Sequence, residues 1–67
     1  MNVDAEILRT LQGKYCKIVI GERLFKLEGY LDEVSDNFVI FRTSTESSVI
    51  NISEIKEIRQ IFNGRRY

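Results

Sequence analysis

Hydrophobic and polar residues follow two different periods along this chain. Near the N-terminus, apolar side chains recur at helical spacing, which predicts a helix over about residues 3–12 with Asn2 as its N-cap. Gly13 is a good C-terminal stop for that helix, and beyond it apolar and polar residues alternate in short runs separated by turn-forming residues. The alternation predicts five strands, over residues 15–20, 25–34, 38–42, 49–52 and 55–62.

The predicted helix is too short to be stable alone, so its apolar stripe should pack on the strands and cap the core. That stripe consists of Val3, Ile7, Leu8 and Leu11. At the other end of the chain, the last predicted strand also fits helical spacing, so a helix stays open there as an alternative. A single turn at Ser53 and Glu54 should precede it.

The second strand has the clearest pattern, because one side of it is apolar and the other polar. The side predicted to face inward carries Phe25, Leu27, Gly29 and Leu31, and the outward side carries Lys26, Glu28, Tyr30 and Asp32. After Leu31 the period slips by one residue, which is typical of a β-bulge near Glu33. We therefore expect this strand to bend near Gly29 and again near Glu33.

The first strand alternates in the same way: Cys16, Ile18 and Ile20 are predicted to face inward, and Tyr15, Lys17 and Val19 outward. One helix followed by five short strands, one of them long and bent, predicts a mainly β fold: a small, strongly bent antiparallel barrel. The single domain covers residues 1–67, with the barrel over about 15–62 and a short basic tail over 63–67. Strands four and five should be its open edges, and an unpaired apolar edge invites pairing with another copy.

Composition narrows the possible functions. The 67 residues contain no histidine and one cysteine, which removes the usual general base, the commonest metal ligand and any internal disulfide. We therefore expect that the protein is not an enzyme and that it binds no cofactor and no metal ion. Ten basic and ten acidic residues cancel, so nucleic acid could be bound only by a local surface. A reduced thiol, no signal-like N-terminus and no apolar run near roughly 20 residues favour a cytoplasmic protein without a membrane partner.

The order of these elements resembles the Sm-like family, which includes the Hfq-like proteins of bacteria and small Sm-like proteins of spore-forming bacteria. The residues that carry the resemblance are the segments 13–20, 27–34 and 36–41, with Gly29 and the polar turn as anchors. The resemblance implies a ring assembled by pairing the fourth strand of one subunit with the fifth strand of the next. It also implies binding of single-stranded RNA at two turns of the barrel.

Carried over by position, the first RNA-binding turn is Asp36, Asn37 and Phe38, and the second contains Asn51 and Ser53. The second turn departs from the family pattern, which has a cation there, whereas this chain has Glu54. Phosphate contacts supply much of the affinity for RNA, so this loss weakens the implied site. Phe38 could instead be a core residue, and Asp36 and Asn37 could simply form the turn.

Four basic residues near the first hairpin could form one RNA-binding face, although separate solvated side chains are the simpler interpretation. They are Lys14, Lys17, Arg23 and Lys26. Tyr30 lies on the outward side among Lys26 and Glu28, and an exposed aromatic ring beside a cation could stack on a base, contact a protein or be a solitary surface residue.

Two functions follow from the sequence. The first is an RNA-binding, RNA-chaperone-like ring of identical subunits. The alternative is a protein-interaction or structural subunit that keeps the fold and the assembly through edge strands but has no RNA site. The architecture favours the first function, and the charge balance favours the second.

Overall fold

The structure is a computed structural model that describes residues 3–62. In this part of the chain a short helix, α1 (Ala5–Arg9), precedes five strands and one 3-10 turn. The strands are β1 (Tyr15–Ile20), β2 (Phe25–Val34), β3 (Phe38–Arg42), β4 (Ser47–Asn51) and β5 (Ile55–Gln60), and the 3-10 turn η1 (Ile52–Glu54) joins the last two. The prediction of one helix and five strands is confirmed, and the last element is a strand and not a helix.

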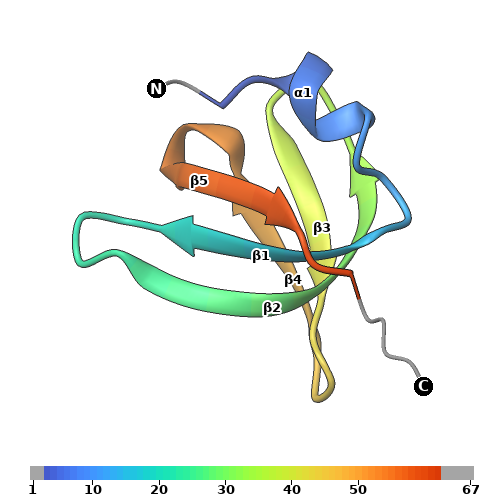
Figure 1. Cartoon of the computed structure of the whole chain (residues 1–67). Helices are drawn as coiled ribbons and strands as arrows, with labels where there is room; N and C mark the ends of the chain where they lie inside the picture. The colour runs from blue at the N-terminus through green and yellow to red at the C-terminus, as the bar shows by residue number, and fades with distance from the viewer. Residues whose placement is uncertain (1–2, 63–67) are drawn as a thin grey trace.

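All five strands belong to one antiparallel sheet in the order β4-β3-β2-β1-β5. As predicted, β4 and β5 are the two edges. They do not pair with each other, so the sheet is strongly bent but not closed, and closure into a barrel is not confirmed. The strands β1 and β5 run across the direction of β3 and β4, while α1 lies over one end of the sheet (Figure 1).

The predicted bulge in β2 is present. The pairing of β2 with β3 shifts between Leu31 and Glu33, so Asp32 is the extra residue of β2.

Gly29 lets the backbone at the end of β3 pass very close to β2. A Cβ atom on Gly29 would lie less than 3.0 Å from the carbonyl oxygen of Arg42 and 3.1 Å from the Cα atom of Thr43. Any side chain at position 29 would therefore meet the backbone at the end of β3.

The core lies between the sheet and α1. Its buried members are Leu8, Cys16, Ile18, Leu31, Val39, Phe41, Ile50 and Ile55. Three predictions of burial are wrong. Ile7 is 41% exposed because the short helix directs Leu8, and not both residues, into the core. Phe25 is 62% exposed because β2 begins at the end of the β1–β2 hairpin, beyond the reach of the core. Val19, predicted to face outward, is largely buried.

The helix is shorter than the predicted span and has a different cap. Asp4 is the N-cap, and its carboxylate accepts a hydrogen bond from the backbone N–H of Ile7 at 2.9 Å. Asn2, the predicted cap, lies outside the described residues, as does the basic tail over 63–67. After Arg9 the chain continues in tighter turns to Gly13, which has a φ of +83° and donates its N–H to the carbonyl of Leu31. Gly13 therefore ends the turns by tying them to β2.

Candidate functional site

The two turns that the family resemblance assigns to RNA lie side by side. The backbone N–H of Ile52 donates to the carbonyl of Asn37 at 2.9 Å, and Phe38 pairs with Asn51 across β3 and β4. The tips of the two connections border an open groove of about 430 Å³, which we call the hairpin-tip groove. Its lining residues are Val3, Asp4, Ala5, Asp36, Asn37, Asn51, Ile52 and Ser53.

Four of the predicted RNA-contacting residues therefore line one groove, but its charge is unfavourable for phosphate. Asp4 and Asp36 place two carboxylates there. Asp36 accepts a hydrogen bond from the guanidinium group of Arg9 at 2.6 Å, which ties α1 to the β2–β3 turn. Phe38 is half-buried and does not line the groove. The groove offers amide and hydroxyl groups for base edges, and no aromatic platform.

Two of the four predicted basic residues, Lys17 and Lys26, lie on the outer side of the sheet, and carboxylates lie among them. In the sheet, Lys17 lies between Glu28 on β2 and Arg59 on β5. Lys26 lies opposite Val19, whose other neighbour is Glu57. On this side Lys17 has Arg59 as a basic neighbour, but Glu28 and Glu57 stand in the same two rows, so the outer side carries mixed charge and no continuous basic face.

The remaining two basic residues lie at opposite ends of β1. Lys14 precedes the strand and Arg23 follows it in the turn. Because β1 has six residues at about 3.3 Å each, the two side chains are separated by the length of the strand. Lys14 and Arg23 therefore cannot act as one phosphate-binding pair.

Tyr30 belongs to a row of three side chains across the outer side of the sheet, which we call the Tyr-Tyr-Arg row: Tyr15, Tyr30 and Arg42. The register places Tyr30 between Tyr15 on β1 and Arg42 on β3. The two rings meet edge to face with centroids 5.1 Å apart, and the Arg42 guanidinium carbon lies 4.8 Å from the Tyr30 ring centre. Tyr30 is therefore not a solitary surface residue.

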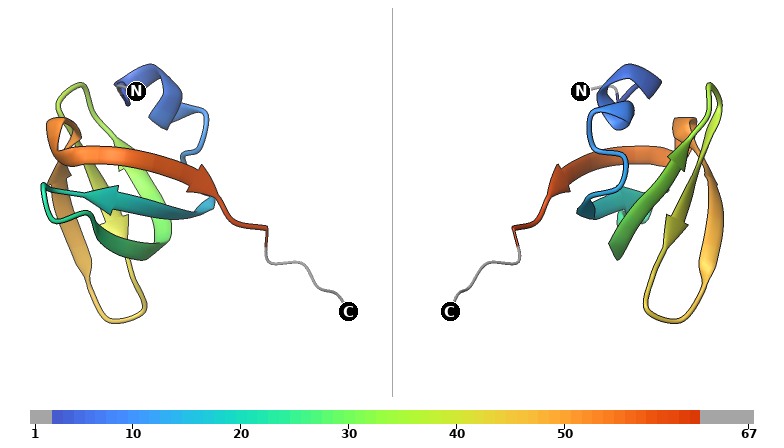
Figure 2. Two further views of the ribbon diagram at one scale, coloured as in Figure 1. Left: turned by 60° about the vertical axis from the view of Figure 1, so that its left-hand side comes forward. Right: turned by 90° about the vertical axis from the view of Figure 1, so that its right-hand side faces the viewer.

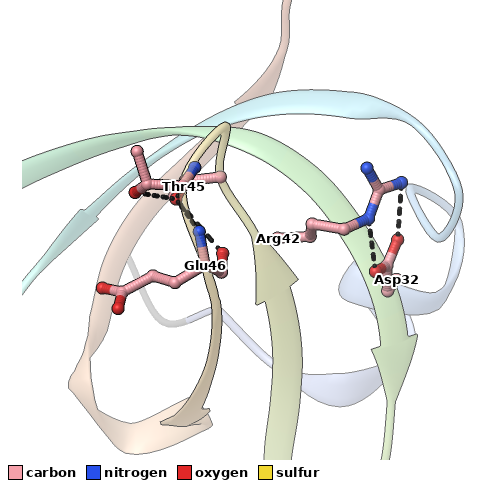
Figure 3. A network of polar contacts seen from close by, with 5 residues as sticks. Asp32, Arg42, Thr45 and Glu46 are labelled. Carbon is pink, nitrogen blue, oxygen red and sulfur yellow. Dashed lines mark hydrogen bonds and ion pairs between the residues drawn. The ribbon is translucent and has the colours of Figure 1, made fainter.

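Charged neighbours hold both ends of this row. At the β3 end, Arg42 donates hydrogen bonds from Nε and one terminal nitrogen to the Asp32 carboxylate, at 2.8 and 3.3 Å (Figure 3). The hydrogen bonds to Asp32 raise the pKa of Arg42 above its ordinary value. At the β1 end, partial desolvation and then the Glu28 carboxylate raise the pKa of Tyr15, whose hydroxyl donates to Glu28 at a long 3.4 Å. Arg42 is thus already paired.

A pocket of about 150 Å³ lies beside the Tyr-Tyr-Arg row and reaches the β3–β4 loop. Thr43 orders this loop, because its hydroxyl group lies 3.1 Å from the carbonyl of Glu46 and accepts hydrogen bonds from the backbone N–H groups of Thr45 and Glu46 (Figure 3). The loop projects at the end of the molecule opposite α1 (Figure 2). This pocket is therefore remote from the hairpin-tip groove.

Sequence reasoning found Tyr30 but missed Tyr15 and Arg42 as its partners. Their alternation alone placed Tyr15 and Tyr30 on the outer side, so the signal that was lacking was the register between the strands. The bulge at Asp32 sets that register, because it decides which residue of β3 lies opposite Tyr30.

Among residues 3–62, no three histidine, cysteine, aspartate or glutamate side chains lie close enough to hold a metal ion. No helix in that range is long and apolar enough to cross a membrane. Cys16 is a free, buried thiol in the core, and burial raises its pKa.

Comparisons with models of protein families, with curated proteins and with solved structures give no match. The Sm-like resemblance consequently stays a prediction.

Proposed function

We propose that this protein is an interaction module that assembles into a homo-oligomer through the two outer strands of its sheet. The observation that carries the proposal is the unprotected edge of β4. Soluble proteins usually protect an edge strand with charges, a proline or a bulge. The segment Ser47–Asn51 has no charged residue and no proline, its ladder with β3 is regular, and Val49 is 69% exposed.

The other edge supplies a partner strand of similar length. β4 has five residues and β5 has six, so β5 of one copy can pair with β4 of the next along almost its whole length. A contact between two different edges is heterologous, and its repetition gives a ring if the rotation closes. The Sm-like resemblance implies the same pair of strands. Assembly would also add buried surface to a domain of this size, which buries only about 60% of its unfolded surface.

Native mass spectrometry of the protein, taken from cells without nuclease treatment, tests this proposal. We expect one closed assembly with a defined number of subunits. A monomer at every concentration up to the millimolar range would refute the proposal. The same spectrum reports any oligonucleotide that stays bound to the assembly.

Single-stranded RNA is a second candidate ligand, and the observation that favours it is the gathering of Asp36, Asn37, Asn51 and Ser53 around the hairpin-tip groove. Because the groove carries carboxylates and no free cation among its lining residues, recognition would run through base edges, and not through phosphate.

Fluorescence anisotropy with labelled single-stranded oligonucleotides tests this candidate. If the groove binds RNA, replacing Asn37 and Asn51 together with alanine abolishes binding, whereas Lys17→Ala and Lys26→Ala leave it nearly unchanged. A shallow dependence on salt is also expected, because few phosphates would be neutralised. Loss of binding in the lysine variants alone would place RNA on the outer side of the sheet and exclude the groove.

A further inference from the structure

The pocket beside the Tyr-Tyr-Arg row contains no residue of the two edge strands. It is formed by β1, β2, the end of β3 and the β3–β4 loop, and its lining residues are Tyr15, Glu28, Gly29, Tyr30, Arg42, Thr43 and Ser44. The free edges of the sheet belong to β4 and β5. A ligand in this pocket is therefore independent of the proposed self-assembly.

The pocket has one carboxylate that no cation neutralises. Within residues 3–62 Glu28 forms no ion pair, and Lys17, which stands opposite it in the sheet, does not pair with it. The charge of Arg42, in contrast, is balanced by its two hydrogen bonds to Asp32 (Figure 3). The remaining charge at the pocket is negative, which favours a cationic ligand over a phosphate or a carboxylate.

The Glu28 carboxylate lies beside aromatic rings. It accepts a hydrogen bond from the Tyr15 hydroxyl at 3.4 Å, and the Tyr15 ring meets the Tyr30 ring edge to face. The face of an aromatic ring attracts a cation. The row already does this once, because the Arg42 guanidinium carbon lies 4.8 Å from the Tyr30 ring centre. The pocket thus combines a carboxylate for ion pairing with rings for stacking.

The size of the pocket and its polar groups fit a guanidinium group. Its volume of about 150 Å³ is several times what a single water molecule needs. A guanidinium group is planar and has five N–H donors, so it can stack on a ring while it donates two parallel hydrogen bonds to one carboxylate. An ammonium group is a compact, strongly hydrated point charge and cannot do both. The Ser44 hydroxyl is a further acceptor on the loop side of the pocket.

We propose that this pocket binds the guanidinium group of an arginine side chain, with Glu28 as its ion-pair partner and Tyr15 and Tyr30 as its aromatic contacts. This inference goes beyond the proposed assembly and does not rest on it. The hairpin-tip groove has no part in it, because that groove is remote from the pocket.

The arginine can come from this chain or from another protein. Ile61 donates its backbone N–H to the carbonyl of Tyr15 at 2.9 Å, so the chain passes the pocket just after β5. Arg65 and Arg66 follow in the sequence and lie outside the described residues. Four residues of extended chain cover about 13–14 Å, which is enough for Arg65 to reach a pocket lined by Tyr15.

The first experiment is an NMR titration with N-acetyl-arginine amide. It uses the unaltered protein and the double variant Arg65→Ala, Arg66→Ala, and follows the backbone amide signals of Gly29 and Ser44, one from β2 and one from the loop. We expect saturable shifts of both signals and much smaller shifts with N-acetyl-lysine amide. Equal shifts with the two ligands would show only a general attraction of positive charge and would overturn the proposal.

The two chains distinguish the sources of the arginine. If the pocket takes an arginine of another protein, both chains bind the amide with the same affinity. If the pocket takes this chain's own arginine, the signals of Gly29 and Ser44 differ between the two chains before any addition, and the double variant binds more tightly. Either result supports a guanidinium site. The absence of saturable shifts in both chains would refute it.

The second experiment assigns the contacts, with one matched control for each substitution. Glu28→Gln should weaken binding by about tenfold or more, because it removes a charge-assisted hydrogen bond. Glu57→Gln is its control, since Glu57 is also an exposed strand residue and does not line the pocket. Tyr15→Leu should weaken binding by about two- to fivefold through loss of the ring, whereas Tyr15→Phe keeps the ring and should retain binding.

The same spectra show whether each variant is folded. A folded Glu28→Gln variant that binds as tightly as Glu57→Gln would exclude Glu28 as the partner and overturn the assignment. Native mass spectrometry of the unaltered protein gives the state of assembly separately, so failure of the arginine site and failure of self-assembly are distinguishable.

Discussion

Replacement of Gly29 by alanine tests the packing of β2 against the end of β3. An added Cβ atom would lie within 3.0 Å of the Arg42 carbonyl oxygen and 2.9 Å from the Arg42 carbonyl carbon. These atoms belong to the backbone and cannot rotate away, so β2 and β3 must separate. Overpacking of this kind costs about 1–3 kcal/mol, and the rigid neighbour places this case near 3 kcal/mol.

That cost is a large part of the total free energy of unfolding. At about 0.05–0.15 kcal/mol per residue, a 67-residue domain has a stability of roughly 3–10 kcal/mol. For a domain of this size a loss of 1 kcal/mol lowers Tm by about 4–8 °C, so Gly29→Ala should lower it by roughly 12–24 °C. Circular dichroism during heating, together with urea unfolding, measures both quantities.

The sign of the effect makes this test decisive. Gly29 has an ordinary negative φ, and without a collision an alanine at such a position would stabilise the fold by about 0.4–1 kcal/mol through the unfolded chain. Gly21→Ala is the control for a different mechanism, because no atom lies within 4 Å of its added Cβ and only its φ of +73° is unfavourable. A Tm of Gly29→Ala equal to or above that of the unaltered protein would refute the close approach of Arg42.

Other substitutions and treatments test separate parts of the structure. Ile58→Asp puts a charge on the core side of β5, so we expect loss of assembly and a lower Tm; an unchanged mass in solution and an unchanged Tm would contradict the placement of β5. Asp36→Asn removes the exposed ion pair with Arg9 and should change the free energy of unfolding by less than about 1 kcal/mol in urea titrations. Iodoacetamide should modify Cys16 slowly in the folded protein and rapidly in urea, since the thiol is buried. Because its pKa is raised on folding, stability should be full below the pKa of the unfolded thiol and fall as pH rises above it; a Tm that rises over that range would contradict this assignment.

The sequence was sufficient for the local features of the fold. Alternation fixed the bounds of β1 and β3, and the change of period after Leu31 located the bulge, because both are written in the order of neighbouring residues. The order of the elements also identified β4 and β5 as edges. Burial at the ends of elements was not predictable, since the exposure of Phe25 and Ile7 depends on how far the sheet and helix extend over the core.

The candidate sites depended on register between strands, which the sequence does not contain directly. Asn37 and Asn51 meet because β3 pairs with β4 in one particular register, which the resemblance anticipated only by position. The register also places Glu28 directly opposite Lys17, so a carboxylate interrupts the basic side chains on this side of the sheet. Tyr15 and Arg42 join Tyr30 only after the bulge at Asp32 has set the alignment of β3.

The return of β5 to β1 has a consequence for folding during synthesis. The ladders from β1 to β4 join strands that follow one another in the sequence, and each can form as a hairpin once its residues are available. β5 pairs instead with the first strand, so that residue 60 meets residue 16. Closing so long a loop is the slow step in folding of sheets with non-local pairing. One edge of β1 therefore stays open until β5 has been made, and the last residues of the sheet determine when this sheet is complete.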